Sequence, residues 1–403
     1  MSSVKRNLRG KADGNQYLKG SAMDSFATNN SIPSEDRPIY EVSNCPTMSD
    51  VTSTLSHLPD FDDHDQILLV RDADAGLRAV IAIHDSTLGP ALGGCRMWPY
   101  ENDTEAMTDV LRLSRGMTYK AAMAGVAAGG GKSVIIGDPA TDRTEALFRA
   151  FGRAVNSLGG RYISGEDVGV SVENMNWAAS ETPYMLGSGD RGGDPAPVTA
   201  FGVYVGIRAA LSHRLGSDDL KGIIVAVQGM GNVGMELCAM LNENGAHLVI
   251  ADVNQSAVSE GVDRFGAEAV APDEIYGVQA DVFAPCALGA IINDDTVGEL
   301  QCAVIAGSAN NQLHEARHGD ILRQRNILYA PDYVINAGGL IAFSLVLSSE
   351  GYSLDRAREL TAGLADTLTE IFTRSDAAGL ATSEIADHMA IERVRKGGKV
   401  NGR

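Results

Sequence analysis

Two lysines and one aspartate have the residue types and the surroundings that proton-transfer chemistry requires. Lys120 in RGMTYKAA and Lys132 in AGGGKSVII lie among apolar residues, glycine and alanine, whereas surface lysines are usually mixed with acidic residues. Burial and a second positive charge nearby lower the pKa of a lysine and make it a base near neutral pH. Asp167, in ISGEDVG at the end of an expected strand, is the candidate acidic partner.

The same three residues also have an ordinary structural interpretation. Lysines are rarely buried, so the residues alone favour two solvated side chains on a helix and a loop. An aspartate before Val-Gly is common as a turn or helix-capping residue. The residue types therefore leave both the catalytic and the structural interpretation open.

Residues 129–133, GGGKS, look like the end of a phosphate-binding loop, which would make the chain an NTPase. That motif needs a glycine where Val126 stands, and a helix directly after the lysine. Instead VIIGDP follows, which is typical of a short strand and a turn. The spacing excludes the NTPase interpretation, and a nucleotide should bind elsewhere.

A dinucleotide-binding turn is predicted around residue 230. The expected strand IIVAVQ leads into GMGNVG and a helix, and the next expected strand, HLVIAD, ends at an aspartate. In this setting the glycines allow the turn, the approach of the pyrophosphate and close helix packing, while the aspartate binds the ribose and repels a 2′-phosphate. NAD is therefore preferred over NADP, and FAD usually uses this turn at the N-terminus of its chain. The expected cofactor-binding residues are Gly229, Gly231, Asn232, Val233, Gly234 and Asp252.

Composition bounds the class of protein. A chain of 403 residues with 44% hydrophobic residues is long enough for two domains, and 45 glycines in short clusters suit an α/β protein with tight turns. A net charge of −19 argues against nucleic acid or an anionic membrane as partners. Five widely spaced cysteines suggest neither a disulfide framework nor a metal site, so a reducing cytoplasm is expected. No segment has the length or apolarity of a signal peptide core or a membrane span.

Alternating strand and helix patterns predict two α/β domains built on parallel sheets. Residues 65–83 have the pattern of a hairpin, 88–100 that of a glycine-rich loop, and 104–125 and 144–160 that of helices. Strand-like runs are expected at ADVFAPC, CAVIAGSAN and ILYAPDYVINAGG, followed by about sixty mostly helical residues. The glycine- and proline-rich stretch 186–200 is the best domain boundary, and the polar residues 1–45 are expected to form a mobile extension.

Seven motifs, in order and with compatible spacing over residues 50 to 345, resemble the glutamate/leucine/phenylalanine/valine dehydrogenase family, closest to its leucine and phenylalanine branch. The resemblance implies a substrate domain over 46–195, joined by the C-terminal helix at about 373–403, and a Rossmann domain over 196–372, with the active site in the cleft between them. It also suggests a homo-oligomer. The motifs are GPALGGCRMWPY, RGMTYKAAMAGVAAGGGKSVIIGDP, YISGEDVG, GDPAPVTAFGVYVG, QGMGNVG, GSANNQL and VINAGGLI.

The resemblance implies NAD-dependent, reversible oxidative deamination of an amino acid to the 2-oxo acid and ammonia. Lys132 matches the catalytic lysine that activates water, and Asp167 the carboxylate that exchanges protons with the amino group. The residues that match those binding the substrate carboxylate are Lys120, Gly93, Gly94 and Asn310. Thr199 matches the residue that holds the nicotinamide amide.

The side-chain pocket is implied at positions 92, 165, 340 and 343, occupied by Leu92, Gly165, Leu340 and Phe343. The glycine and Leu340 are more like the phenylalanine branch, the surrounding motifs are more like the leucine branch, and Phe343 departs from both. Leucine, valine, isoleucine and phenylalanine therefore remain open as substrates, and glutamate is disfavoured because these positions offer no cation. The alternative is a catalytically inactive NAD-binding regulatory protein of the same fold, against which the retention of both lysines and Asp167 argues.

Overall fold

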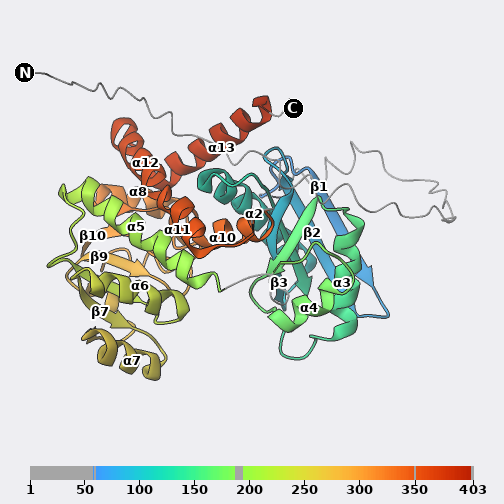
Figure 1. Cartoon of the computed structure of the whole chain (residues 1–403), viewed down its shortest axis with the longest axis horizontal. Coiled ribbons are helices and arrows are strands. Elements are labelled where there is room, and N and C mark those ends of the chain that lie inside the picture. The colour runs from blue at the N-terminus through green and yellow to red at the C-terminus, as the bar shows by residue number, and fades with distance from the viewer. Residues whose placement is uncertain (1–57, 59, 187–193, 349–350, 401–403) are drawn as a thin grey trace, which may run out of the picture.

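The computed structural model describes residues 58, 60–186, 194–348 and 351–400. Two lobes, each built on one sheet, lie side by side, with helices from the end of the chain between and above them (Figure 1). The expected extension over residues 1–45 lies outside the described residues.

The first lobe is a five-stranded mixed sheet with the order β1-β2-β4-β3-β5. The predicted hairpin is confirmed, because β1 and β2 pair antiparallel, and β2 also pairs antiparallel with β4. Strands β3, β4 and β5 run parallel, as the alternation of strand and helix predicted, and the antiparallel hairpin extends this part of the sheet. The strands are β1 (Gln66–Asp72), β2 (Leu77–Asp85), β3 (Ala91–Trp98), β4 (Gly129–Ile136) and β5 (Tyr162–Glu166).

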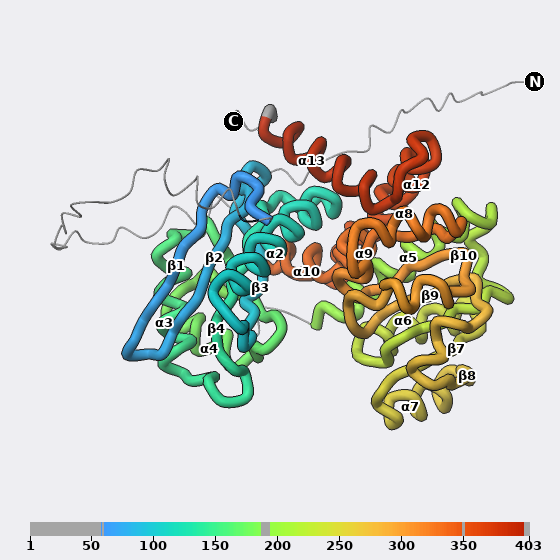
Figure 2. The backbone as a smooth tube through the Cα atoms, turned by 180° about the vertical axis from the view of Figure 1, so that it is seen from behind, coloured from blue at the N-terminus to red at the C-terminus, as the bar shows by residue number. Residues whose placement is uncertain are grey.

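Helices cover both faces of this sheet. Helix α2 (Asp103–Ala124) begins after an Asn102 cap and buries Val110 and Leu111 against Val80 and Val134. Its length agrees with the predicted helix over 104–125. Helices α3 (Glu145–Ser157) and α4 (Val172–Ala179) cover the opposite face. Because α2 leans toward the second lobe, the residues of its last turns are brought to the junction between the lobes (Figure 2).

Residues 91–98 of the glycine-rich stretch 88–100 form strand β3, where the sequence predicted a loop. The reason is close backbone packing inside the sheet: a Cβ at Gly93 would lie 1.7 Å from the carbonyl oxygen of Gly131 on β4. Likewise, a Cβ at Gly94 would lie 2.7 Å from the carbonyl oxygen of Glu166. Glycine, which usually weakens a strand, is here the residue that allows neighbouring backbones to approach.

The second lobe is a six-stranded parallel sheet with the order β11-β10-β9-β6-β7-β8, the doubly wound arrangement of dinucleotide-binding folds. The predicted strands before and after the glycine turn are confirmed as β6 and β7. The run ILYAPDYVINAGG contributes only a two-residue strand before it becomes helical, because Pro331 is followed by the short helix α9. The strands are β6 (Ile224–Gln228), β7 (His247–Ala251), β8 (Glu268–Ala269), β9 (Ala280–Pro285), β10 (Cys302–Ile305) and β11 (Leu328–Tyr329).

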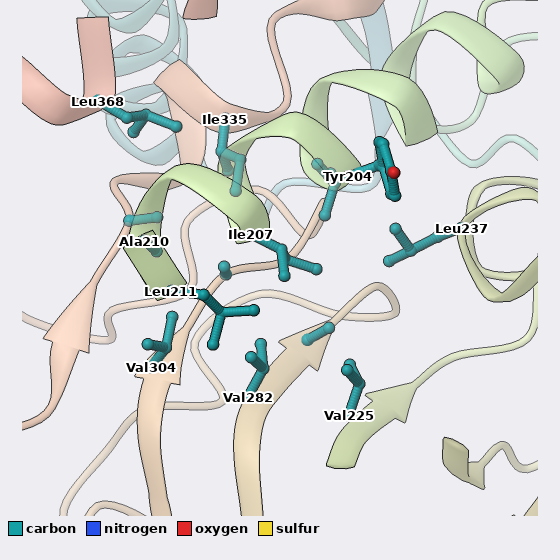
Figure 3. Packing of buried hydrophobic residues seen from close by; sticks show 14 of the residues in the cluster. Tyr204, Ile207, Ala210, Leu211, Val225, Leu237, Val282, Val304, Ile335 and Leu368 are labelled. Atoms are coloured by element: carbon teal, nitrogen blue, oxygen red, sulfur yellow. The ribbon is translucent and has the colours of Figure 1, made fainter. Parts of the chain in front are cut away.

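The core of the second lobe lies between its sheet and helix α5 (Ala196–Leu215). Figure 3 shows Ile207 and Leu211 of this helix pointing toward Val282 and Val304 on neighbouring strands, and all four side chains are fully buried. On its other side α5 packs against α12. The remaining helices are α6 (Asn232–Glu243), α7 (Gln255–Phe265), α8 (Arg317–Gln324), α9 (Asp332–Ile335), α10 (Gly338–Val346), α11 (Leu354–Ala362), α12 (Leu364–Ala378) and α13 (Thr382–Val400).

The last helix returns to the first lobe. The guanidinium of Arg393 on α13 donates to the carbonyl oxygen of Met123 at the end of α2 over 2.9 Å. None of the helices in the described ranges combines the length and apolarity needed to cross a membrane. The helical prediction for the last sixty residues is confirmed for the part of the chain that the structure describes.

Candidate active site

A cavity of about 360 Å³ lies where the two lobes meet. It is lined from the first lobe by β3, α2, β4 and the end of β5, and from the second by the start of α5, the loop after β10, and α9 and α10. Eleven residues singled out in the sequence line this one cavity: Lys120, Lys132, Asp167, Gly93, Gly94, Asn310, Thr199, Leu92, Gly165, Leu340 and Phe343.

At the centre of the cavity, Lys132 and Asp167 form an ion pair. The Nζ of Lys132 lies 2.7 Å from Oδ2 of Asp167, and the lysine side chain is only 8% exposed. Strand β4 places the lysine inside the sheet, and Asp167 follows the end of β5. A nearly dry, hydrogen-bonded ammonium–carboxylate pair can pass a proton in either direction, as amine and water chemistry at one carbon requires.

A third charged group, Arg96 on β3, holds the same carboxylate. Its Nε lies 3.3 Å from Oδ2 of Asp167, and its Nη1 lies 2.8 Å from Oδ2 of Asp109. Burial acts to raise the pKa of Asp167, but the positive charges of Lys132 and Arg96 outweigh it and leave this pKa below its usual value. Asp167 is therefore ionised at neutral pH and ready to accept a proton.

Lys120 presents a second cation in the same cavity from the last turns of α2. Burial lowers the pKa of Lys120 to about 8, with the charge of Lys132 acting in the same direction and those of Asp332 and Asp167 opposing it. At neutral pH Lys120 is charged and suited to binding a carboxylate.

Backbone forms the floor of the cavity next to these lysines. The close approach of β3 and β4 at Gly93 exposes main chain instead of side chains to the cavity. Below it, Tyr162 is fully buried, and its hydroxyl donates to the carbonyl oxygen of Gly93 over 2.8 Å. The ring of Tyr162 takes the space that a side chain at Gly131 would need, since a Cβ there would lie 2.8 Å from it.

Two asparagines from the second lobe face this floor. The side-chain Nδ2 of Asn336 donates to Oδ1 of Asn310 over 2.8 Å and to the carbonyl oxygen of Ser308 over 3.0 Å. The amide nitrogen of Asn310 therefore remains available to donate into the cavity. The Oδ1 of Asn336 is buried and has no hydrogen-bond partner among the described residues, so an N–H donor is missing at this point of the cavity.

The opposite wall of the cavity is apolar. Leu92 and Leu340 are buried, Phe343 is partly buried, and Leu186, which the sequence did not single out, completes the wall beside Gly165. Two further cations also line the cavity, but both are paired with Asp109: Arg96 over 2.8 Å and Arg112 over 3.0 Å. Among the described residues, this wall of the cavity therefore presents carbon atoms and no unpaired cation.

The glycine turn lies apart from this cavity, between β6 and β9, where the strand order of the second sheet reverses. Gly229 adopts a φ of 102° and a Cβ on it would lie 2.8 Å from Ala287, so only glycine fits. Gly234 packs its α-carbon against the turn, because a Cβ would lie 2.0 Å from the carbonyl oxygen of Gly229. Gly231 caps α6, which begins at Asn232 and continues through Val233.

The carboxylate at the end of β7 faces the same turn. Asp252 accepts hydrogen bonds from the backbone N–H groups of Met230 over 2.6 Å and Asn254 over 2.7 Å. The acidic residue and the glycines thus form one crevice at the carboxyl ends of the strands, where dinucleotides bind in this fold.

Sequence reasoning missed Arg96, Asn336 and Asp332, although two of the quoted motifs contain Arg96 and Asn336. Each of these side chains acquires its importance from a partner far away in the chain, for example Arg96 from Asp109 and Asp167. The available signal for Arg96 was a charged residue two positions after the glycine pair, in GGCR.

The sequence matches two family descriptions, "Glu/Leu/Phe/Val dehydrogenase, dimerisation domain" over residues 64–184 and "Glutamate/Leucine/Phenylalanine/Valine dehydrogenase" over 250–402. It is 52% identical over 335 residues to a leucine dehydrogenase of Geobacillus stearothermophilus, covering 82% of this chain and 91% of the relative. It is 46% identical over 349 residues to a phenylalanine dehydrogenase of Caldalkalibacillus thermarum, covering 84% and 93%. The solved structure of an L-tryptophan dehydrogenase from Nostoc punctiforme matches with a TM-score of 0.77 and 43% identity, covering 87% of this chain and 99% of the other.

A doubly wound nucleotide-binding lobe, joined through a lysine- and aspartate-lined cavity to a second α/β lobe, defines a two-domain dehydrogenase. The chain belongs to the glutamate/leucine/phenylalanine/valine dehydrogenase family and is an amino-acid dehydrogenase. The expectation of an enzyme is confirmed, and these relatives lend no support to the inactive alternative.

Proposed function

We propose that the protein catalyses the NAD-dependent, reversible oxidative deamination of an apolar L-amino acid, either leucine, valine and isoleucine or phenylalanine. The observation that carries this proposal is one cavity holding the Lys132–Asp167 pair, the second cation Lys120 and a carbon-lined wall. The names of relatives at 46–52% identity, leucine and phenylalanine dehydrogenases, support the same substrate class.

In the proposed mechanism, Lys120 binds the substrate carboxylate, together with the backbone at Gly93 and Gly94 and the amide nitrogen of Asn310. Asp167, ionised beside Lys132 and Arg96, accepts a proton from the substrate ammonium and so leaves the neutral amine from which a hydride can depart. Lys132, after releasing its own proton to solvent, acts as the neutral amine and removes a proton from the water that adds to the iminium carbon. Asp167 then returns its proton to the amino group and takes up the hydroxyl proton as ammonia leaves and the carbonyl forms. The low exposure of Lys132 keeps bulk water from the pair.

The residues present fit a nicotinamide dinucleotide. The turn at Gly229 and Gly231 leaves room for a pyrophosphate, since a Cβ at Gly231 would have no heavy atom within 4 Å among the described residues. The orphaned Oδ1 of Asn336 requires an N–H donor, which a carboxamide supplies, and Thr199 lines the same cavity nearby. When bound, such a dinucleotide accepts the hydride from the substrate Cα. We propose NAD over NADP because Asp252 places a negative charge where a 2′-phosphate would lie.

We expect Asp252→Asn to lower the preference for NAD. Loss of a charged hydrogen-bond acceptor costs about 1.5–3 kcal/mol, so the kcat/KM ratio of NAD to NADP should fall roughly 10- to 150-fold. Steady-state kinetics with both cofactors measures the ratio. Asp263→Asn, on the exposed face of α7, makes the same change of charge and should leave the ratio unchanged. An unchanged ratio in Asp252→Asn would reject this carboxylate as the selector.

We expect Gly165→Ala to favour aliphatic over aromatic substrates. The new methyl group would contact Leu186 at 3.5 Å, an ordinary van der Waals distance, so the fold tolerates it while the apolar end of the cavity shrinks. One carbon in an apolar pocket is worth about 1–3 kcal/mol, so kcat/KM for phenylalanine relative to leucine should fall about tenfold or more. An unchanged ratio would place the side-chain pocket away from residue 165.

The experiment that tests the proposed function is NADH formation from a panel of leucine, valine, isoleucine, phenylalanine, tryptophan and glutamate at alkaline pH. Turnover on apolar members, with glutamate poor, is the expected result. No turnover on any apolar amino acid with either NAD or NADP, despite tight NAD binding, would reject it.

We also propose a division at residues 195/196, with 46–195 and the C-terminal helix of 373–403 forming the substrate domain and 196–372 the nucleotide domain. The bond from Arg393 on α13 to α2 supports the return of that helix to the first lobe. The dimerisation description of the matched region supports a homo-oligomer. Cysteines Cys95, Cys238, Cys286 and Cys302 are free thiols, which supports a cytoplasmic location.

A further inference from the structure

A carboxylate that the proposed mechanism does not use lies in the active-site cavity. Asp332 is the first residue of α9, and its side chain is fixed by the main chain around it. Its Oδ2 accepts a hydrogen bond from the backbone N–H of Gln312 over 2.9 Å, and its Oδ1 from that of Tyr333 over 2.7 Å. These two hydrogen bonds therefore fix the position of the Asp332 carboxylate in the cavity.

The bond from Gln312 connects Asp332 to the loop that carries Asn310. The side chain of Gln312 is fully buried, and its Nε2 donates to the carbonyl oxygens of Gly307 over 2.9 Å and Ala309 over 3.0 Å. The loop is thus closed on itself by Gln312 and tied to α9 by Asp332. Displacing the carboxylate would release the residue expected to hold the substrate carboxylate.

On its other side Asp332 faces α2 across the junction of the two lobes. The neighbouring residues Tyr119 on α2 and Tyr333 on α9 have ring centroids 6.4 Å apart, so the two helices meet at this point. Lys120 follows Tyr119 in the chain, Asp332 precedes Tyr333, and both Lys120 and Asp332 line the cavity. Lys132 is already paired with Asp167, whereas the opposite charge that acts most on Lys120 is that of Asp332.

We propose that Asp332 is a positioning residue whose fixed negative charge keeps Lys120 protonated in the empty cleft, while its hydrogen bonds hold the Asn310 loop. The proposal rests on the proposed function, because Lys120 is there the group that binds the substrate carboxylate. The negative charge of Asp332 also repels the incoming substrate carboxylate. It therefore keeps Lys120 protonated but lowers the affinity for the substrate.

The other charged and titratable groups at this point act as follows. Burial and the charge of Lys132 both lower the pKa of Lys120, and Asp167 raises it more weakly than Asp332 does. Burial raises the pKa of Asp332 itself, whereas the backbone N–H groups of Gln312 and Tyr333 and the charge of Lys120 act against this rise and favour its charged form. Around Asp332 stand Tyr329, Tyr333 and Asp387 of α13, whose own pKa values are all raised, first by burial. Among the described groups around Lys120, only Asp167, whose charge acts more weakly on it, could replace Asp332 as its partner after the removal of Asp332.

The test is the pH dependence of binding of 4-methylpentanoate and 3-phenylpropanoate, carboxylates without a titrating amine, measured by calorimetry with saturating NAD. Lys120 binds a carboxylate only when protonated, so affinity for the wild-type protein should be lost as the pH rises through about 8. In Asp332→Asn, whose amide oxygen can still accept the hydrogen bond from Gln312 and so hold the Asn310 loop, the midpoint of this loss should fall by about one pH unit, without weaker binding at pH 6. Asp332→Glu, which keeps the charge, should keep a midpoint near that of the wild type.

Asp320→Asn, at an exposed carboxylate of α8, makes the same change of net charge and should not move the midpoint. A midpoint unmoved in Asp332→Asn, or affinity weakened equally at every pH, would overturn the proposal and leave Asp332 a purely structural residue. If the asparagine variant does not fold, Asp332→Ser is measured instead. Turnover of the wild-type protein on leucine or phenylalanine in the same preparation separates failure of this inference from failure of the proposed function.

Discussion

Lys132→Met should lower kcat for the best amino acid by about 10²–10⁴-fold while changing its KM little. A positioned proton-transfer group contributes about this factor, and methionine keeps the length and apolar contacts of the lysine stem while removing its amine. Because Lys132 and Asp167 act on the same protons through one 2.7 Å contact, their effects should not add. Asp167→Asn and the double variant should therefore lose about as much as Lys132→Met alone. Stopped-flow and steady-state NADH formation measures each kcat.

The double variant also separates catalysis from folding. Lys132→Met leaves the partly buried carboxylate of Asp167 with Arg96 alone, which costs stability, whereas the double variant removes both charges and should regain that stability. Lys221→Met, at an exposed lysine, is the control for removal of a positive charge. If Lys132→Met retained a tenth or more of wild-type kcat with an unchanged unfolding temperature, Lys132 would not be the base.

Lys120→Met should instead act on binding. Removing one partner of a desolvated charge pair costs about 2–5 kcal/mol, which corresponds to a loss in kcat/KM of roughly 30- to 5000-fold. Most of this loss should be in KM, because the groups that move protons, Lys132 and Asp167, remain paired. The affinity for 4-methylpentanoate should also lose its dependence on pH near 8, since the titrating group is gone.

Calorimetry and kinetics on the same preparation distinguish the two lysines. The KM for NAD should stay within a few-fold of wild type in Lys120→Met, because the glycine turn lies in a separate crevice. Equal loss of kcat in both lysine variants, with carboxylate binding intact, would contradict the division of roles between them.

The nucleotide-binding lobe could be predicted from the sequence because its signals are local. The strand, the turn at Gly229, the helix and Asp252 lie within 29 consecutive residues, from Ile224 to Asp252, and each has a pattern that neighbouring residues enforce. The same holds for α2, with its cap at Asn102 and its spacing of Val110 and Leu111. Their bounds follow from hydrogen bonding and periodicity within the segment.

The features that the sequence did not predict depend on contacts between segments far apart in the chain. Strand β3 was predicted as a loop because Gly93 and Gly94 weaken an isolated strand, and only the backbones of β4 and β5 turn them into a requirement. Arg96 and Asp332 were missed for the same reason. An arginine between two aspartates, or a carboxylate held by a loop twenty residues earlier, has no pattern in one stretch of sequence.

The glycine floor under Lys132 has a consequence for redesign of the enzyme. Gly93 lines the cavity and packs closely against Gly131 of β4, and neither position accepts a side chain. Substitutions at Gly93 and Gly131 are therefore not tolerated. On the apolar wall, a Cβ at residue 165 would lie at an ordinary contact distance from Leu186, so a larger residue at one position can be offset by a smaller one at the other. A library that randomises the wall and leaves the floor fixed should therefore diversify the accepted amino acids while each member that folds keeps the same chemistry.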